Sequence, residues 1–162
     1  MIYVLKEKPF SPEKCLQSVL IFEGMECEKR GISLRLCHDS ALPEKVTGFG
    51  SMLQRALCEL VEQAVRRTRR GGTITVCCRA DRPSEGLVNL HFRIDDNGTR
   101  ISEGEMQTLF ESKMSAGTEE PLQSGLFSAR EAATLMGGSI HARSGRRGTR
   151  FTLTVTVRIH EM

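Results

Sequence analysis

Apolar residues recur at helical spacing in four parts of the chain and alternate with polar residues in five others. The spacing predicts helices over 11–30, 52–65, 102–110 and 125–136. The alternation predicts strands over 32–37, 73–79, 87–95, 140–144 and 150–159. Short turn segments separate two pairs of these strands, which predicts antiparallel hairpins. The order of elements predicts an α+β fold, a two-layer α/β sandwich whose mixed, largely antiparallel sheet carries its helices on one face.

The length of the chain, 162 residues, suits one domain of ordinary size, so we expect a single domain over 1–162. Within it, residues 1–10 are expected to form a linker before the first helix. Residues 111–124 combine Gly, Thr, Ser and Pro with little periodicity, and we expect a loop there.

Composition narrows the class of protein. Hydrophobic residues make up 39% and charged residues 27% of the chain, which is the globular range. The chain has no apolar run long enough to span a membrane and no secretory signal, so we expect a soluble, cytoplasmic protein without membrane contact. A net charge of +3 is too small to indicate a nucleic-acid partner, and we expect none.

Arginines gather at two places, over 66–70 and over 143–150. Each cluster either forms a solvated helix or loop end or contacts an anionic partner. The sequence leaves both interpretations open.

Six cysteines are scattered along the chain, and none forms a C-x-x-C pair. The spacing therefore matches neither a zinc motif nor a dithiol redox motif. Because cytoplasmic thiols stay reduced, we expect six free cysteines that act mostly as small buried hydrophobic residues.

The helix expected over 52–65 carries Glu59 and Gln63 four residues apart and therefore on one face. A carboxylate and an amide placed in this way can converge on a metal-bound phosphate. The same two residues also suit an ordinary half-exposed helix.

A turn motif, Asp95-Asp96-Asn97-Gly98, follows the strand expected over 87–95. The Asp96 carboxylate can accept a hydrogen bond from a ligand amino group, and Gly98 allows the backbone to pass close to a ligand. A plain turn explains the motif equally well in isolation. Two further motifs flank the loop over 111–124, Leu109-Phe110-Glu111 before it and Gln123-Ser124-Gly125-Leu126 at its end. The last hairpin turns at Gly145-x-x-Gly148-Thr149.

Taken in order, these motifs resemble the catalytic ATP-binding domain of sensor histidine kinases, in the ATPase superfamily shared with the gyrase, Hsp90 and MutL proteins. The resemblance runs from about Phe10 to the end of the chain. It implies ATP and magnesium as ligands and makes residues 111–124 a lid over the nucleotide. It gives Gln63 the role of metal ligand and Glu59 that of the catalytic acid that orients the attacking group. The residues that it implies for nucleotide binding are Gln63, Arg66, Asp96, Gly98, Arg100, Gly125, Leu126 and Thr149.

Three positions depart from the family pattern. Gln63 replaces an asparagine, Arg100 replaces the second glycine of the turn motif, and Gly125 alone remains of the lid glycines. By this resemblance we expect an intact adenine side, where Asp96 accepts a hydrogen bond from the adenine amino group, and a weakened phosphate side. Arg100 is expected either to obstruct the site, by filling adenine space or by pairing with Asp95 or Asp96, or to reach a phosphate.

The resemblance implies a protein-histidine kinase domain that binds ATP or ADP and passes phosphoryl groups to a phosphoacceptor domain of the same or another kinase, and so to a response regulator. The histidines of this chain do not supply that acceptor, because all of them fall in or beside expected strands: His38, His91, His141 and His160. Two alternatives stay open. One is a degenerate, non-catalytic interaction or regulatory module of a phosphorelay, and the other is a stand-alone serine or anti-sigma-type kinase domain.

Overall fold

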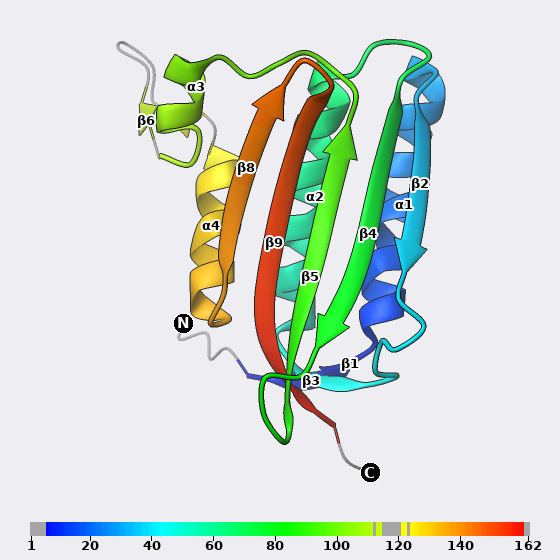
Figure 1. Cartoon of the computed structure of the whole chain (residues 1–162), viewed down its shortest axis with the longest axis vertical. Helices are drawn as coiled ribbons and strands as arrows, with labels where there is room; N and C mark the ends of the chain where they lie inside the picture. The colour runs from blue at the N-terminus through cyan, green and yellow to red at the C-terminus, as the bar shows by residue number, and fades with distance from the viewer. Residues whose placement is uncertain (1–5, 112, 115–120, 123, 161–162) are drawn as a thin grey trace, which may run out of the picture.

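The computed structural model describes residues 6–111, 113–114, 121–122 and 124–160 (Figure 1). Its helices are α1 (Pro12–Arg30), α2 (Gly50–Arg67), α3 (Glu103–Thr108) and α4 (Ser124–Leu135). Its strands are β1 (Lys8–Phe10), β2 (Ser33–His38), β3 (Val46–Gly48), β4 (Thr73–Asp81), β5 (Leu87–Asp96), β6 (Lys113–Met114), β7 (Pro121–Leu122), β8 (Ser139–Gly145) and β9 (Gly148–Ile159).

The main sheet has the strand order β1-β3-β9-β5-β4-β2, and β8 pairs with the opposite side of β9. Strand β2 runs parallel to β4, whereas the other pairs in this sheet are antiparallel. Helices α1, α2 and α4 lie together behind the sheet in Figure 1, and α2 contacts both of its neighbours. The predicted α+β sandwich with helices on one face is confirmed.

Local sequence signals account for the two long helices. Ser11 caps α1 by accepting a hydrogen bond from the backbone N–H of Lys14, and Gly31 ends the helix in the left-handed conformation, with φ of 68°. Helix α2 buries a continuous apolar stripe against the sheet: Leu53, Ala56, Leu57, Leu60, Val61, Ala64 and Val65.

Alternation along β5 positions the site described below. Val88, Leu90, Phe92 and Ile94 are fully buried against the helices. Asp96 is the next residue on the same face and is also buried, at 5% exposure. The strand therefore carries its last inward-facing side chain, a carboxylate, into the apolar layer.

The expected linker over 1–10 is wrong for its last residues, because β1 forms a strand there. Strand β1 pairs with β3, and the Phe10 ring packs against Gly50 at the start of α2. Three residues are too few to show an alternating pattern in the sequence. Of the expected lid, residues 112, 115–120 and 123 lie outside the described residues.

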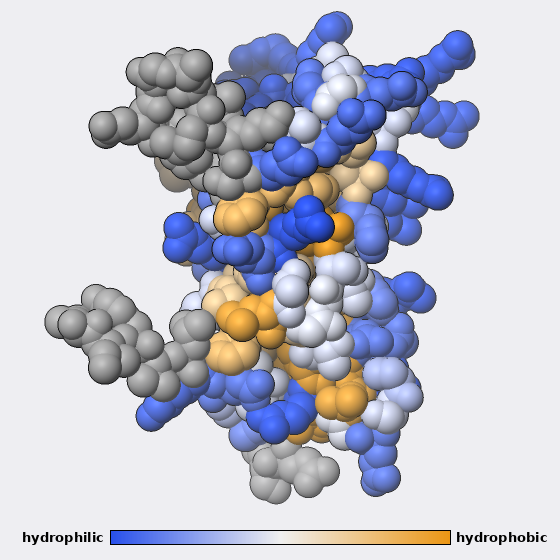
Figure 2. Space-filling view, turned by 90° about the vertical axis from the view of Figure 1, so that its left-hand side faces the viewer, coloured by the Kyte–Doolittle hydropathy of each residue, from blue (hydrophilic) through white to orange (hydrophobic). Residues whose placement is uncertain are grey.

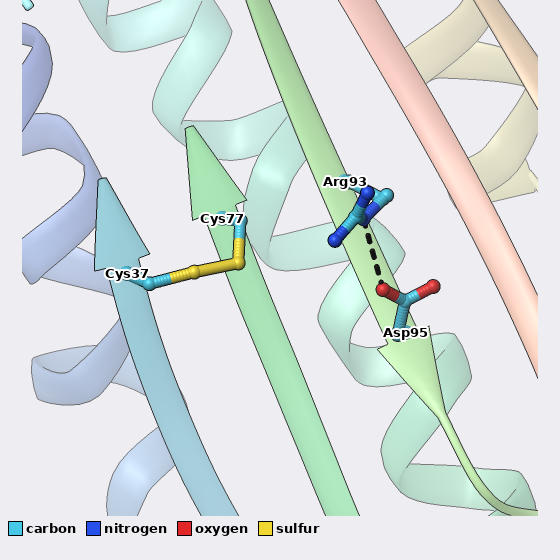
Figure 3. The surroundings of a disulfide bond; sticks show 4 residues. All are labelled: Cys37, Cys77, Arg93 and Asp95. Atoms are coloured by element: carbon cyan, nitrogen blue, oxygen red, sulfur yellow. Dashed lines mark hydrogen bonds and ion pairs between the residues drawn. A yellow bond between two sulfur atoms is a disulfide. The ribbon is translucent and has the colours of Figure 1, made fainter. Parts of the chain in front are cut away.

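The expectation of six free thiols is also wrong, because Cys37 and Cys77 form a disulfide (Figure 3). The two residues face each other on the parallel strands β2 and β4, with their Cα atoms 4.5 Å apart. This register brings together residues that lie 40 positions apart in the sequence. The remaining cysteines are free, and three of them, Cys15, Cys27 and Cys78, are buried as expected.

Among the described residues, no helix has both the length and the apolar character needed to cross a membrane. Figure 2 shows the side of the molecule that carries α3, α4 and β8, where apolar patches lie between polar side chains. One apolar residue on this side, Leu135 at the end of α4, is 55% exposed.

Candidate functional site

Asp96 is held rigidly at the end of β5. Its Oδ1 atom accepts a hydrogen bond of 2.9 Å from the backbone N–H of Gly98. Thr149 lies directly across from Asp96 in the β5–β9 register.

The Thr149 hydroxyl forms a hydrogen bond of 2.8 Å with the Ser144 hydroxyl. Ser144 Oγ in turn accepts a 2.7 Å hydrogen bond from the backbone N–H of Ile101. This chain of bonds ties the turn after Asp96 to the β8–β9 hairpin.

The same turn is fastened to the end of α2. The backbone N–H and the hydroxyl of Thr99 both donate to the Arg67 carbonyl, each at 3.0 Å. A Cβ atom at Gly98 would lie 2.3 Å from that carbonyl oxygen. Gly98 is therefore required for the close approach of the turn to α2, and a side chain there would push the two elements apart.

Arg67 covers the Asp96 carboxylate. Its guanidinium lies over the Phe151 ring, with Cζ 5.4 Å from the ring centroid, and its Nη2 is 3.7 Å from Asp96 Oδ2. Phe110, the residue before the expected lid, packs edge-on against the same ring with centroids 6.3 Å apart. Burial raises the pKa of Asp96 and lowers the pKa of Arg67, because each charged group has lost water on folding.

A second group of expected site residues gathers where α2 meets the start of α4. The Glu59 carboxylate packs against Gly125, where an added Cβ atom would lie 1.9 Å from Glu59 Oε2. Burial is the main cause that raises the pKa of Glu59, and the charge on Glu62 adds to it. Gln63 is half-buried and Arg66 is exposed.

Leu126 is fully buried in the core. Its side chain is therefore unable to contact a nucleotide, and only its backbone is left for that role. A groove of about 480 Å³ runs between α2 and α4 and ends at Glu59, with Met52, Ala132 and Leu135 among its lining residues. The groove lies along the N-terminal turns of α2, away from Asp96.

Glu59 and Gln63 fit a magnesium site in which phosphate oxygens supply further ligands. Glu59 and Gln63 supply one carboxylate and one amide from a single face of α2. Mg²⁺ usually takes one or two carboxylates and fills its other positions with phosphate oxygens and water. Within the described part of the chain, no cluster of three or more His, Cys, Asp or Glu residues could hold a metal by itself.

The expected pairing of Arg100 with Asp95 or Asp96 is wrong, whereas its filling of adenine space or its contact with a phosphate stays a prediction. Arg100 is exposed, and within the described residues it forms no ion pair with Asp95 or Asp96. Asp95 pairs with Arg93 and Arg150 on the open face of the sheet, and Arg67 is the arginine at Asp96.

Sequence reasoning missed Arg67, although its spacing held a usable signal. Leu60 and Ala64 belong to the buried stripe of α2, and Arg67 continues their i, i+4, i+7 series. Within the arginine cluster over 66–70, this periodicity separates the half-buried Arg67 from the exposed Arg66, Arg69 and Arg70.

A buried carboxyl group lies beside this site, between α1 and α2. Glu23 of α1 is only 6% exposed and lies close enough to the half-buried Glu62 of α2 to feel its charge. Burial raises the pKa of Glu23 to about 7, and the charges on Glu62, Glu59 and Glu26 act in the same direction. Folded chains therefore hold a proton on Glu23 that unfolded chains release at lower pH.

We expect the free energy of unfolding to fall as the pH rises from about 4.5 to 7, because Glu23 must ionise against burial and like charge over that range. Glu23→Gln should therefore stabilise the fold by about 1–2 kcal/mol at pH 8 and change it little at pH 4.5. Urea denaturation at both pH values measures this. Glu28→Gln, at an exposed position of α1, is the control. An equal effect of Glu23→Gln at both pH values would contradict the assignment.

The chain is similar in sequence to a known family and to curated proteins. The family described as "Histidine kinase-, DNA gyrase B-, and HSP90-like ATPase" matches residues 49–159. The aerobic respiration control sensor protein ArcB of Escherichia coli strain K12 is 30% identical over 158 residues, covering 93% of this chain and 20% of ArcB. The sensor histidine kinase CusS of the same strain is 30% identical over 141 residues, covering 83% of this chain and 27% of CusS. The chain thus spans only a minor part of either relative.

Solved structures share the fold. A nucleotide-free form of the catalytic domain of histidine kinase ThkA superposes with a TM-score of 0.75 at 18% identity, covering 94% of this chain and 98% of that domain. Full-length ShkA in complex with AMPPNP gives a TM-score of 0.79 at 20% identity, covering 99% of this chain and 33% of ShkA.

Proposed function

Because this chain belongs to the family of histidine kinase-, DNA gyrase B- and HSP90-like ATPases, as the ATPase domain of a sensor histidine kinase, we propose that it binds ATP between Asp96 and Glu59 and binds the phosphates weakly. The observation that carries the proposal is the buried Asp96 carboxylate, which is fixed through one oxygen and has no hydrogen-bond partner on the other. A buried acceptor in this state is suited to a ligand N–H group.

The spacing along α2 supports one extended ligand. Arg67, beside Asp96, and Glu59 are eight positions apart on α2, or about 12 Å along the helix axis. The base would lie at Asp96, while Glu59, Gln63 and Arg66 would face the phosphates and magnesium. Bound ATP would supply the phosphoryl group, and the acceptor would be a histidine of a phosphoacceptor domain that passes it to a response regulator.

The contact between Glu59 and Gly125 supports weak phosphate binding. Phosphates bind well at a helix N-terminus because free backbone N–H groups point toward them. In this chain the Glu59 carboxylate packs against the first turn of α4 and would repel an incoming phosphate. The half-buried Gln63, one methylene longer than asparagine, is expected to hold magnesium less well.

We expect calorimetric titration to show saturable ATP binding with a dissociation constant weaker than micromolar, and magnesium to change it by less than ten-fold. GTP is the control for base recognition. Micromolar binding that tightens ten-fold or more with magnesium, about 1.4 kcal/mol of coupling, would show an intact phosphate side. Absence of ATP binding at millimolar concentration would contradict the proposed function and favour a non-catalytic phosphorelay module.

A further inference from the structure

Within the described part of the chain, the buried side-chain nitrogen and oxygen atoms that lack a hydrogen-bond partner are Arg67 Nε, Arg67 Nη2 and Asp96 Oδ2. All of them belong to one contact between the end of α2 and the end of β5. Buried polar atoms are nearly always paired in folded proteins, so a group of unpaired ones needs a physical explanation.

Both side chains are held in place by other contacts. Asp96 is fixed through Oδ1 by the Gly98 N–H, which leaves Oδ2 directed at Arg67, and its side chain is 0% exposed. Arg67 lies on the Phe151 ring, and its side chain is 15% exposed. The two unpaired groups thus form a fixed pair, with an acceptor beside a donor.

Arg67 and Asp96 do not form a hydrogen-bonded salt bridge. The 3.7 Å between Nη2 and Oδ2 is too long for a hydrogen bond. If Arg67 only closed the site, we would expect its guanidinium to donate a hydrogen bond to the Asp96 carboxylate, because burial removes water from both charged groups. Arg67 Nε and Nη2 and Asp96 Oδ2 are therefore available to bind a third partner.

The chemistry of that partner follows from the pair. It must offer an N–H donor to Asp96 and an acceptor to Arg67, side by side on one edge of the ligand. Adenine has such edges, because its exocyclic amino group lies between the ring nitrogens N1 and N7.

We propose that Arg67 is a base-recognition residue: it donates to the adenine ring nitrogen next to the amino group that Asp96 accepts from. This inference rests on the proposed function and adds a second contact to it. Arg67 then determines specificity, because it requires an acceptor beside the amino group.

The test is a set of dissociation constants for ATP, 7-deaza-ATP and 1-deaza-ATP, measured with the parent chain and with Arg67→Met. We expect Arg67→Met to weaken ATP binding about ten-fold. We expect the parent to lose a similar factor with the one analogue that lacks the contacted nitrogen. Arg67→Met should show no further loss with that analogue, since the contact is already gone.

Arg69→Met, at an exposed position just beyond α2, is the matched control and should leave all three constants unchanged. Circular dichroism verifies the fold, and if Arg67→Met does not fold, Arg67→Lys keeps the charge without the planar fork and should show the same pattern.

Tighter ATP binding by Arg67→Met would show that Arg67 only blocks the site. If the loss from Arg67→Met and the loss from the deaza analogue add fully, Arg67 does not contact the ring nitrogen. Either result overturns the inference. If ATP binding depends on Asp96 but not on Arg67, the proposed function stands and the inference fails. If the parent does not bind ATP, both fail.

Discussion

Asp96→Asn should weaken ATP binding by about 10- to 150-fold while the fold stays intact. The substitution removes the charge from a buried acceptor that has no partner among the described residues, and a hydrogen bond to a charged group contributes about 1.5–3 kcal/mol. The fold should tolerate the change, because burial already disfavours the charged form of Asp96. Calorimetric titration gives the affinity, and thermal unfolding verifies the fold.

The neighbouring carboxylate provides a matched control. Asp95 precedes Asp96 in β5 but lies on the open face of the sheet, where it pairs with Arg93 and Arg150. Asp95→Asn should therefore leave ATP affinity unchanged. Equal losses for the two variants would indicate a general effect of charge and would exclude specific recognition by Asp96.

Loss of the Cys37–Cys77 disulfide should lower the free energy of unfolding by about 2–4 kcal/mol. The bond closes a segment of 40 residues that contains β3 and the whole of α2, and closing a loop of this length restricts the unfolded chain. It also fastens the edge strand β2 to β4, its partner in the main sheet. Urea denaturation of the parent, with and without dithiothreitol, measures the effect.

The double variant Cys37→Ser, Cys77→Ser should match the reduced parent and should not respond to dithiothreitol. Cys58→Ser, at a free cysteine on α2, is the control that keeps the bond. Stability of the parent that does not change on reduction would mean that this cross-link makes no contribution in solution.

The sequence was sufficient to predict the long elements, because each one carries its own periodicity. Helix α1 begins after Ser11 and ends before Gly31, as its capping residues indicate. Strand β5 could even be assigned a buried face, since every second residue from Val88 to Ile94 is apolar. Strands β1 and β3 were missed because each has only three residues and is defined by pairing with distant chain segments.

The site was predicted less completely, because its contacts depend on how elements pack. Asp96, Gly98 and Thr149 could be found from a turn motif and a hairpin, and the structure brings them together. The turn motif suggested Arg100, which is near Asp96 in sequence, as the arginine at Asp96, whereas Arg67 reaches Asp96 from another element. The disulfide was missed for the same reason, since it depends on the register of β2 against β4.

The most direct test of the account is an NMR titration with ATP that follows the Arg67 side-chain Nε–H and the backbone amides of Gly98 and Thr149. These groups lie around the Asp96 side chain, so we predict that all of them shift together, with one dissociation constant, and that Asp96→Asn removes the shifts. Shifts confined to other parts of the chain, or unchanged by Asp96→Asn, would contradict the claim that Asp96 and Arg67 form the nucleotide site.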